Sequence, residues 1–129
     1  MASKYIVLDS SAIIAFYNDE DANHADAVLA SHTFREKIVV LHPYVVQEVV
    51  TVLAYRFSNP IAEEFLRDAK DAGNVLLAPV QIEKDIAYFI KAKRKMSFTD
   101  LALIRLAVEM NASLFTFDRQ MFAFFRRQR

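Results

Sequence analysis

The sequence contains no cysteine, no tryptophan and only one glycine, Gly73. Without cysteine, disulfide bonds, zinc thiolate sites and cysteine nucleophiles are excluded. One glycine cannot build the loops that hold nucleotide phosphates, because the dinucleotide-binding fingerprint and the P-loop each need more than one. The chain therefore lacks the usual means of disulfide scaffolding, thiol chemistry and nucleotide-phosphate binding.

An excess of charge of either sign is also missing, since 16 Lys and Arg residues balance 16 Asp and Glu residues. A basic footprint for nucleic acid over the whole chain is therefore absent. One short stretch is nevertheless strongly basic, through Lys91, Lys93, Arg94 and Lys95. Such a run is most often solvated surface, but it is also compatible with a phosphate-bearing substrate.

No apolar run approaches the roughly 20 residues that a membrane-spanning helix needs. The N-terminus does not have the pattern of a secretory signal peptide. Together with the absence of cysteine, these features lead us to expect a cytoplasmic protein. With 129 residues, 54% of them apolar, the chain is expected to form one domain over residues 1–129.

Apolar segments with strand and helix patterns alternate along the chain. Short runs rich in β-branched and aromatic residues predict strands at 4–8, 38–41, 75–77 and 113–117. Helical spacing predicts helices at 10–17 and 22–31, from Pro43 to the break at Asn59, from Pro60 to near Gly73, around 82–90, at 101–110 and at 119–126. We expect Gly73 to be the C-cap of its helix. The alternation predicts an α/β fold, with a parallel sheet that has helices on both faces.

Four acidic residues stand where a lone carboxylate is costly. Asp9 and Asp118 each end an apolar strand. Glu48 lies in a valine-rich stretch, and Asp100 opens a long apolar helix. Burying an unpaired carboxylate is unfavourable, and a shared cation offsets that cost. Because Mg²⁺ prefers oxygen ligands, and parallel sheets bind ligands at the carboxyl ends of their strands, the pattern predicts a magnesium site there.

Each acid also has a simpler interpretation. Asp is a favoured N-cap, which alone would explain Asp9 or Asp118. Asp100 lies three residues after Ser97, as in a capping box, and Glu48 could face solvent on its helix. The four acids taken together are more specific than any one of them.

Other kinds of active site have less support. The three histidines, at positions 24, 32 and 42, form no H-E-x-x-H motif, so a zinc hydrolase is poorly supported. Ser10 and Ser11 have no obvious histidine base, which argues against a catalytic triad.

The acids lie within motifs at characteristic intervals. These motifs are an apolar strand with Asp-x-Ser/Thr at 7–14, a His-Ala pair at 24–25, a glutamate motif at 46–50, an acid with its apolar helix at 98–104, and Thr-x-Asp at 116–118. With them the chain resembles the PIN domain family, especially the VapC-type toxins, over nearly its whole length. The resemblance weakens after the last acid, where the chain ends in Phe-Arg-Arg-Gln-Arg and many relatives continue into an edge strand.

The resemblance implies a three-layer α/β/α fold with a central parallel sheet of four strands, or five if an edge strand is present. It implies a Mg²⁺- or Mn²⁺-dependent endoribonuclease, whose catalytic and metal-binding residues would be Asp9, Glu48, Asp100 and Asp118. The hydroxyls of Ser11 and Thr116 would orient the acids, although local turn bonding explains them equally well. RNA phosphates would bind to the basic run Lys91, Lys93, Arg94 and Lys95.

A VapC-type toxin would have two protein partners, a small antitoxin encoded beside it and a second copy of itself. Candidates for an exposed apolar groove that takes an antitoxin helix are Tyr55, Phe57, Phe65 and Leu66, unless these complete the core. Two alternatives remain within the family: a nuclease of RNA processing without an antitoxin, and an inactive binding module. A receiver domain of the response-regulator type is a weak rival, because Asp9 has no paired N-terminal acid and no lysine follows the last strand.

Overall fold

The computed structural model describes residues 3–128, so positions 1, 2 and 129 of the predicted domain lie outside the described residues. Its strands are β1 (Tyr5–Leu8), β2 (Ile38–Leu41), β3 (Val75–Leu77) and β4 (Ser113–Phe115). Its helices are α1 (Ser10–Tyr17), α2 (His24–Thr33), α3 (Pro43–Arg56), α4 (Asn59–Asp71), α5 (Ile82–Ala92), α6 (Phe98–Glu109) and α7 (Arg119–Gln128), with a short 3₁₀ turn, η1 (Phe34–Glu36).

The four strands form one parallel sheet in the order β3-β2-β1-β4. In this register Val7 of β1 lies opposite Val40 of β2 and Leu114 of β4. Within the described residues no fifth strand follows, because the chain after β4 forms α7 as far as Gln128. The predicted four-stranded parallel sheet is therefore confirmed.

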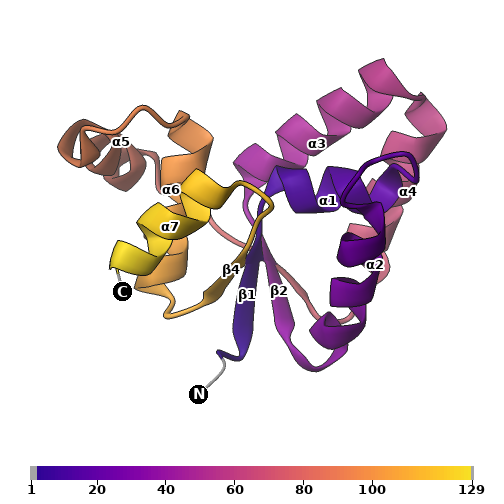
Figure 1. Cartoon of the computed structure of the whole chain (residues 1–129), viewed down its shortest axis with the longest axis horizontal. Coiled ribbons are helices and arrows are strands. Elements are labelled where there is room, and N and C mark those ends of the chain that lie inside the picture. Colours follow the sequence, from indigo (N-terminus) through magenta and orange to yellow (C-terminus); the bar gives the residue numbers. More distant parts are fainter. Residues whose placement is uncertain (1–2, 129) are drawn as a thin grey trace.

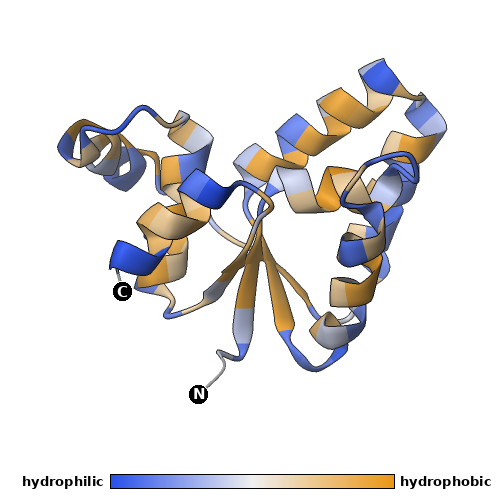
Figure 2. Cartoon of the chain, viewed as in Figure 1, coloured by the Kyte–Doolittle hydropathy of each residue, from blue (hydrophilic) through white to orange (hydrophobic). Residues whose placement is uncertain are grey.

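Helices cover both faces of the sheet (Figure 1). In that view α1, α2, α3 and α4 lie on one side of the strands, and α5, α6 and α7 lie on the other. The strands and much of α6 are hydrophobic, whereas loops and helix ends are hydrophilic (Figure 2). This is the predicted three-layer arrangement, and it brings the carboxyl ends of all four strands to one edge of the molecule.

The core lies between the sheet and these two helical layers. Val7 and Val40, the central residues of β1 and β2, are completely buried, as is Val49 of α3. Helix α6 buries residues on every side, which confirms its predicted depth; they are Leu101, Ala102, Leu103, Ile104, Leu106 and Ala107. Burial of each large apolar side chain contributes about 1.5–3 kcal/mol to folding.

The predicted role of Gly73 is wrong. Helix α4 ends at Asp71, and its C-cap is Ala72 in an extended conformation, with φ −70° and ψ 125°. Gly73 does not have a positive φ. No left-handed turn is needed there, because the chain runs directly into Asn74, whose amide donates to the carbonyls of Phe34 and Lys37.

Several element boundaries also differ from those predicted. The second helix begins at His24 and not at 22, because Asp21 accepts a hydrogen bond from the backbone N–H of Asn23 and holds a turn. The last strand ends at Phe115 and not at 117. None of the helices in the described part of the chain is long and apolar enough to cross a membrane.

Candidate active site

Polar side chains gather where three of the strands end. Asp9 follows β1, His42 follows β2 and Thr116 follows β4. Because the strands are parallel, these positions lie at the same edge of the sheet, where α1, α3 and α7 begin. The acids predicted to act together are on or beside these elements.

Asp9 is buried, with 4% of its surface exposed. It occupies the N-cap position of α1, but its side chain makes no capping hydrogen bond. Its Oδ2 atom instead accepts hydrogen bonds from Ser11 Oγ at 2.8 Å and from Thr116 Oγ1 at 2.7 Å. The helix-capping interpretation of this side chain is therefore wrong, and the carboxylate is held by two hydroxyls.

The same two hydroxyls also fix the loop that carries Asp118. Ser11 Oγ accepts from the backbone N–H of Phe117 at 3.2 Å, and Thr116 Oγ1 accepts from the backbone N–H of Asp118 at 3.0 Å. These bonds divert the chain from the sheet after Phe115, which explains the early end of β4. Asp9 and Asp118 are thus joined through Ser11 and Thr116.

Asp118 is exposed at the start of α7. Its Oδ1 accepts from the backbone N–H of Met121 at 3.1 Å, so the capping interpretation holds for this residue. Among the residues that the structure describes, no hydrogen-bond donor contacts its second oxygen. One oxygen of Asp118 is therefore free to bind a ligand.

Glu48 is exposed on α3, and Ser10 of α1 connects it to the first strand. Ser10 Oγ donates to Glu48 Oε1 and lies 3.5 Å from Asp9 Oδ1. Ser10 was not among the predicted orienting residues. Its position directly after Asp9 was the only available signal, because the contact with Glu48 depends on how α1 and α3 pack.

Asp100 lies in the first turn of α6, where Ser97 Oγ accepts from its backbone N–H at 3.0 Å. The pKa of the Asp100 carboxyl is raised from 3.8 to about 6. Burial is the largest cause, followed by the negative charge of Asp9; Ser97 opposes the rise, and the charges of Asp118 and Glu48 add to it. All three other acids thus lie within electrostatic reach of Asp100.

The carboxylates suit a hard divalent cation by their chemistry. Oxygen is the ligand that Mg²⁺ and Mn²⁺ prefer, and like charges held close together favour a cation between them. None of the four acids forms an ion pair within the described residues. In the conformation of those residues, however, no three acidic or histidine side chains converge into a group that could hold a metal ion.

The basic run lies between α5 and α6. Lys91 is in the last turn of α5, and Lys93 is its C-cap in the left-handed region, with φ 51°. Arg94 and Lys95 follow in the loop that leads to Ser97, and all four basic side chains are exposed. The Arg94 guanidinium lies 4.8 Å from the ring centroid of Phe124 on α7, which ties the basic loop to that helix.

The histidines do not form a metal site. His42 is buried, and its Nδ1 accepts from the backbone N–H of Tyr44 as the N-cap of α3. Burial lowers its pKa. His24 Nδ1 lies 2.8 Å from the carbonyl oxygen of Ala15, and His32 Nδ1 lies 3.4 Å from a guanidinium nitrogen of Arg35. Each ring therefore has a separate local partner.

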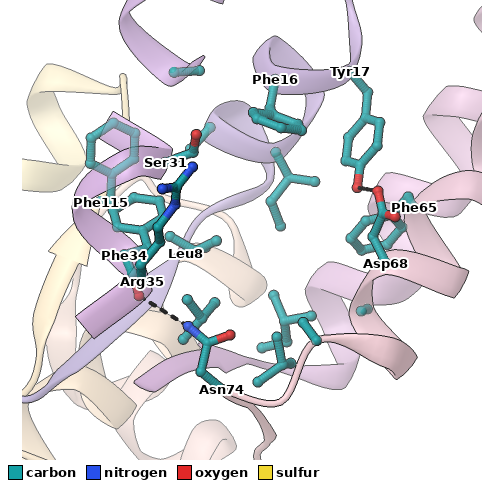
Figure 3. A pocket seen from close by; sticks show the side chains of 18 residues that line it. Leu8, Phe16, Tyr17, Ser31, Phe34, Arg35, Phe65, Asp68, Asn74 and Phe115 are labelled. Carbon is teal, nitrogen blue, oxygen red and sulfur yellow. Dashed lines mark hydrogen bonds between the residues drawn. The ribbon is translucent and has the colours of Figure 1, made fainter. Parts of the chain in front are cut away.

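A cavity of about 480 Å³ opens on the face of the sheet covered by α1, α2 and α4 (Figure 3). Leu8, Phe34 and Phe115 line one side, and Phe65 lines the opposite side. Its polar residues include Ser31, Arg35, Asn74 and the pair in which Tyr17 OH donates to Asp68.

This cavity differs from the groove predicted from the sequence. Phe65 has 3% of its surface exposed and belongs to the core, so its predicted exposure is wrong. Tyr55, Phe57 and Leu66 are exposed, but none of them lines the cavity. Phe65 turns inward, and its ring contacts Tyr17 of α1 edge to face.

The chain is similar to known proteins in sequence and in fold. A family model of the PIN domain matches residues 6–127. The crystal structure of VapC20 from Mycobacterium tuberculosis, described as a sarcin-ricin loop cleaving toxin, is similar with a TM-score of 0.80 and 22% sequence identity, over 92% of this chain and 93% of that chain. No protein of curated function matches the sequence.

Proposed function

The chain belongs to the PIN domain family, and we propose that it is a Mg²⁺- or Mn²⁺-dependent endoribonuclease of the VapC type. The observation that carries the proposal is the hydroxyl network at the carboxyl edge of the sheet, in which Ser10 contacts both Glu48 and Asp9. In the same network Thr116 donates to Asp9. The charges of Asp9, Asp118 and Glu48 also help to raise the pKa of Asp100. Four carboxylates without a basic partner are unfavourable unless a cation is bound among them. We propose that these four acids are the metal-binding and catalytic residues.

When bound, a divalent cation would lower the pKa of a water molecule and neutralise charge on the phosphodiester. The protein's own contribution is to hold the acids in place. Asp9 is fixed through Oδ2, and its Oδ1 has only the long contact of 3.5 Å with Ser10 Oγ. Asp118 is fixed through Oδ1, which leaves Oδ2 available. Ser11 and Thr116 therefore orient carboxylates and need not contact the substrate.

The proposed RNA-binding residues are Lys91, Lys93, Arg94 and Lys95. These residues are exposed and lie just before α6, a position that suits contacts with the phosphates of an RNA strand bound across the four acids. Contacts of this kind depend strongly on salt and carry little sequence information.

For the antitoxin, we propose that the cavity between α1, α2 and α4 takes apolar side chains of a helix from a small partner protein. Its wall is mainly apolar, with Phe16, Phe34 and Phe65 among the largest side chains. Amphipathic helices bind such grooves through apolar residues one turn apart.

We also propose that the protein is a single PIN domain that acts in the cytoplasm.

The proposal is tested with purified protein and single-stranded RNA. Cleavage should require Mg²⁺ or Mn²⁺ and stop in EDTA. Asp9→Asn should remove most of the activity and leave the protein folded, because the amide keeps the shape of the carboxylate but loses its charge. If an equally purified Asp9→Asn protein cleaved RNA as fast as wild type, the assignment would be rejected.

A further inference from the structure

The hydroxyl of Ser10 contacts two of the four acids that lie near one another. It donates to Glu48 Oε1 and lies 3.5 Å from Asp9 Oδ1. The two acids belong to different elements, since Asp9 immediately precedes α1 and Glu48 is on α3. Ser10 therefore connects Asp9 directly with the exposed Glu48.

Glu48 needs such a bridge more than the other acids do. Asp9 is buried and accepts from two hydroxyls, Asp118 caps α7, and Asp100 is half-buried in α6. Glu48 is exposed and has a longer side chain, and ordering such a side chain costs up to about 2 kcal/mol of rotamer entropy. Within the described residues, Ser10 is its hydrogen-bond partner.

Ser10 itself occupies the first position of α1, where a hydroxyl ordinarily faces water or a nearby backbone group. Here it donates its single proton to a carboxylate from another helix. A hydrogen bond to a charged acceptor is stronger than one between neutral groups. This bond fixes Oε1 and leaves Oε2 of Glu48 without a donor among the described residues.

We infer that Ser10 is a positioning residue that holds Glu48 beside Asp9, so that both carboxylates can bind the same cation. The inference rests on the proposed function, and it assigns Ser10 a task different from that of Ser11. Ser11 supports the buried Asp9 and the loop before α7, whereas Ser10 acts on an exposed side chain. Loss of Ser10 should therefore affect cation binding more than folding.

The experiment measures Mn²⁺ binding by calorimetry with RNA-free protein, together with melting temperature in EDTA. Ser10→Ala should weaken Mn²⁺ binding about 10-fold, the lower end of the range for groups that orient metal ligands. Its melting temperature in EDTA should stay close to wild type. Ser10→Thr keeps the hydroxyl and should restore the affinity. Thr33→Ala is the matched control, because among the described residues the hydroxyl of Thr33 bonds to the carbonyl of Ala30 within α2.

A double-mutant cycle identifies the residue through which Ser10 acts. In a Glu48→Ala background, adding Ser10→Ala should cause no further loss of Mn²⁺ affinity, because the partner is already gone. An undiminished further loss in that background would overturn the inference, since Ser10 would then act elsewhere.

The inference and the proposed function can fail separately. If wild type binds Mn²⁺, Asp9→Asn does not, and Ser10→Ala binds as tightly as wild type, then the inference is wrong and the metal site stands. Ser11→Ala should lower the melting temperature in EDTA, because Ser11 supports the buried Asp9. An equal fall for Ser10→Ala would also overturn the inference. If wild type binds no Mn²⁺, the proposed function fails and the inference fails with it.

Discussion

At the scale of single residues, the raised pKa of Asp100 reflects the electrostatic repulsion among the four acids. Burial and the charge of Asp9 raise its pKa to about 6, with smaller contributions from Asp118 and Glu48. The charged form of Asp100 is therefore destabilised in the metal-free protein. A bound cation would reverse this effect, because it favours the ionised carboxyl.

Replacing Asp100 by Asn should accordingly have opposite effects with and without metal. In EDTA near neutral pH, Asp100→Asn should melt at or above the temperature of wild type, because one repulsive charge is gone. In millimolar Mg²⁺ the wild type should gain stability through binding, and the variant should gain less. If Asp100 acted only as a charge at the helix terminus, the free energy of unfolding of the variant would fall by a few tenths to about 1 kcal/mol. The fall would be the same in EDTA and in Mg²⁺.

The raised pKa of Asp100 also predicts a pH dependence. Between 3.8 and about 6 the folded state binds more protons at this residue than the unfolded state does. The contribution of this protonation to the stability of the folded state is therefore fully present below pH 3.8. It is lost as pH rises through about 6. Melting curves in EDTA should show wild type losing stability relative to Asp100→Asn across this window.

Comparison with the variant is needed because His42 has the opposite effect. Burial lowers the pKa of His42, so stability is lost as pH falls below its ordinary value of 6.5. This loss is common to both proteins and cancels in the difference. A difference in melting temperature that does not change with pH would contradict the effect predicted for Asp100.

At the scale of helices and strands, a buried polar cluster joins the elements that carry Glu48 and Asp100. Asp85 of α5 accepts from Arg105 Nε of α6 at 2.8 Å and from Tyr44 OH of α3 at 2.9 Å. The side chain of Asp85 is 0% exposed and that of Arg105 is 12% exposed. The cluster therefore fixes three helices through one carboxylate.

Removing that carboxylate should be costly. Asp85→Ala leaves the Arg105 charge largely buried without its main partner, which should destabilise the protein by about 3–5 kcal/mol in urea unfolding. The matched control is Lys84→Ala on the same helix, because Lys84 forms an exposed ion pair with Glu109 at 3.1 Å. That change should cost at most about 1 kcal/mol. Equal losses in the two variants would show that the buried cluster has no special role.

At the scale of the whole molecule, α5 has an apolar face that the described residues leave partly exposed. Its exposed residues recur at helical spacing, and they are Ile82, Ile86, Phe89 and Ile90. On the same helix Asp85 is buried and accepts a hydrogen bond from Arg105 of α6. An apolar patch of this kind suits a contact with a second copy, in line with the homodimer expected from the sequence.

The dimer is tested by light scattering at tens of micromolar protein. Ile86→Glu places a charge in the middle of the α5 face and should shift the protein toward monomer. Tyr55→Glu is the matched control, because Tyr55 is 88% exposed on α3 and was a sequence-based candidate for an apolar contact. A wild-type protein that is strictly monomeric would count against the dimer, and an effect of Tyr55→Glu alone would move the interface to α3.

Local sequence patterns were sufficient to predict the alternation of strands and helices along the chain, the parallel sheet and the burial of α6. These features depend on local apolar periodicity, which each segment carries independently of the rest of the chain. The sequence also indicated Asp9, Glu48, Asp100 and Asp118 as a possible set, since parallel strands deliver their carboxyl ends to one edge. That argument covers Asp9 and Asp118, which follow strands, whereas the approach of Glu48 and Asp100 depends on the packing of α3 and α6.

Packing between distant elements selected which local possibility each residue adopts. Asp9 could have capped α1, but hydroxyls from both α1 and the β4–α7 loop bind its carboxylate instead. Phe65 could have been exposed, but α4 turns it into the core. Ser10 meets Glu48 across 38 positions of sequence because α1 packs on α3. Such contacts depend on the packing of distant elements, and local sequence patterns do not encode them.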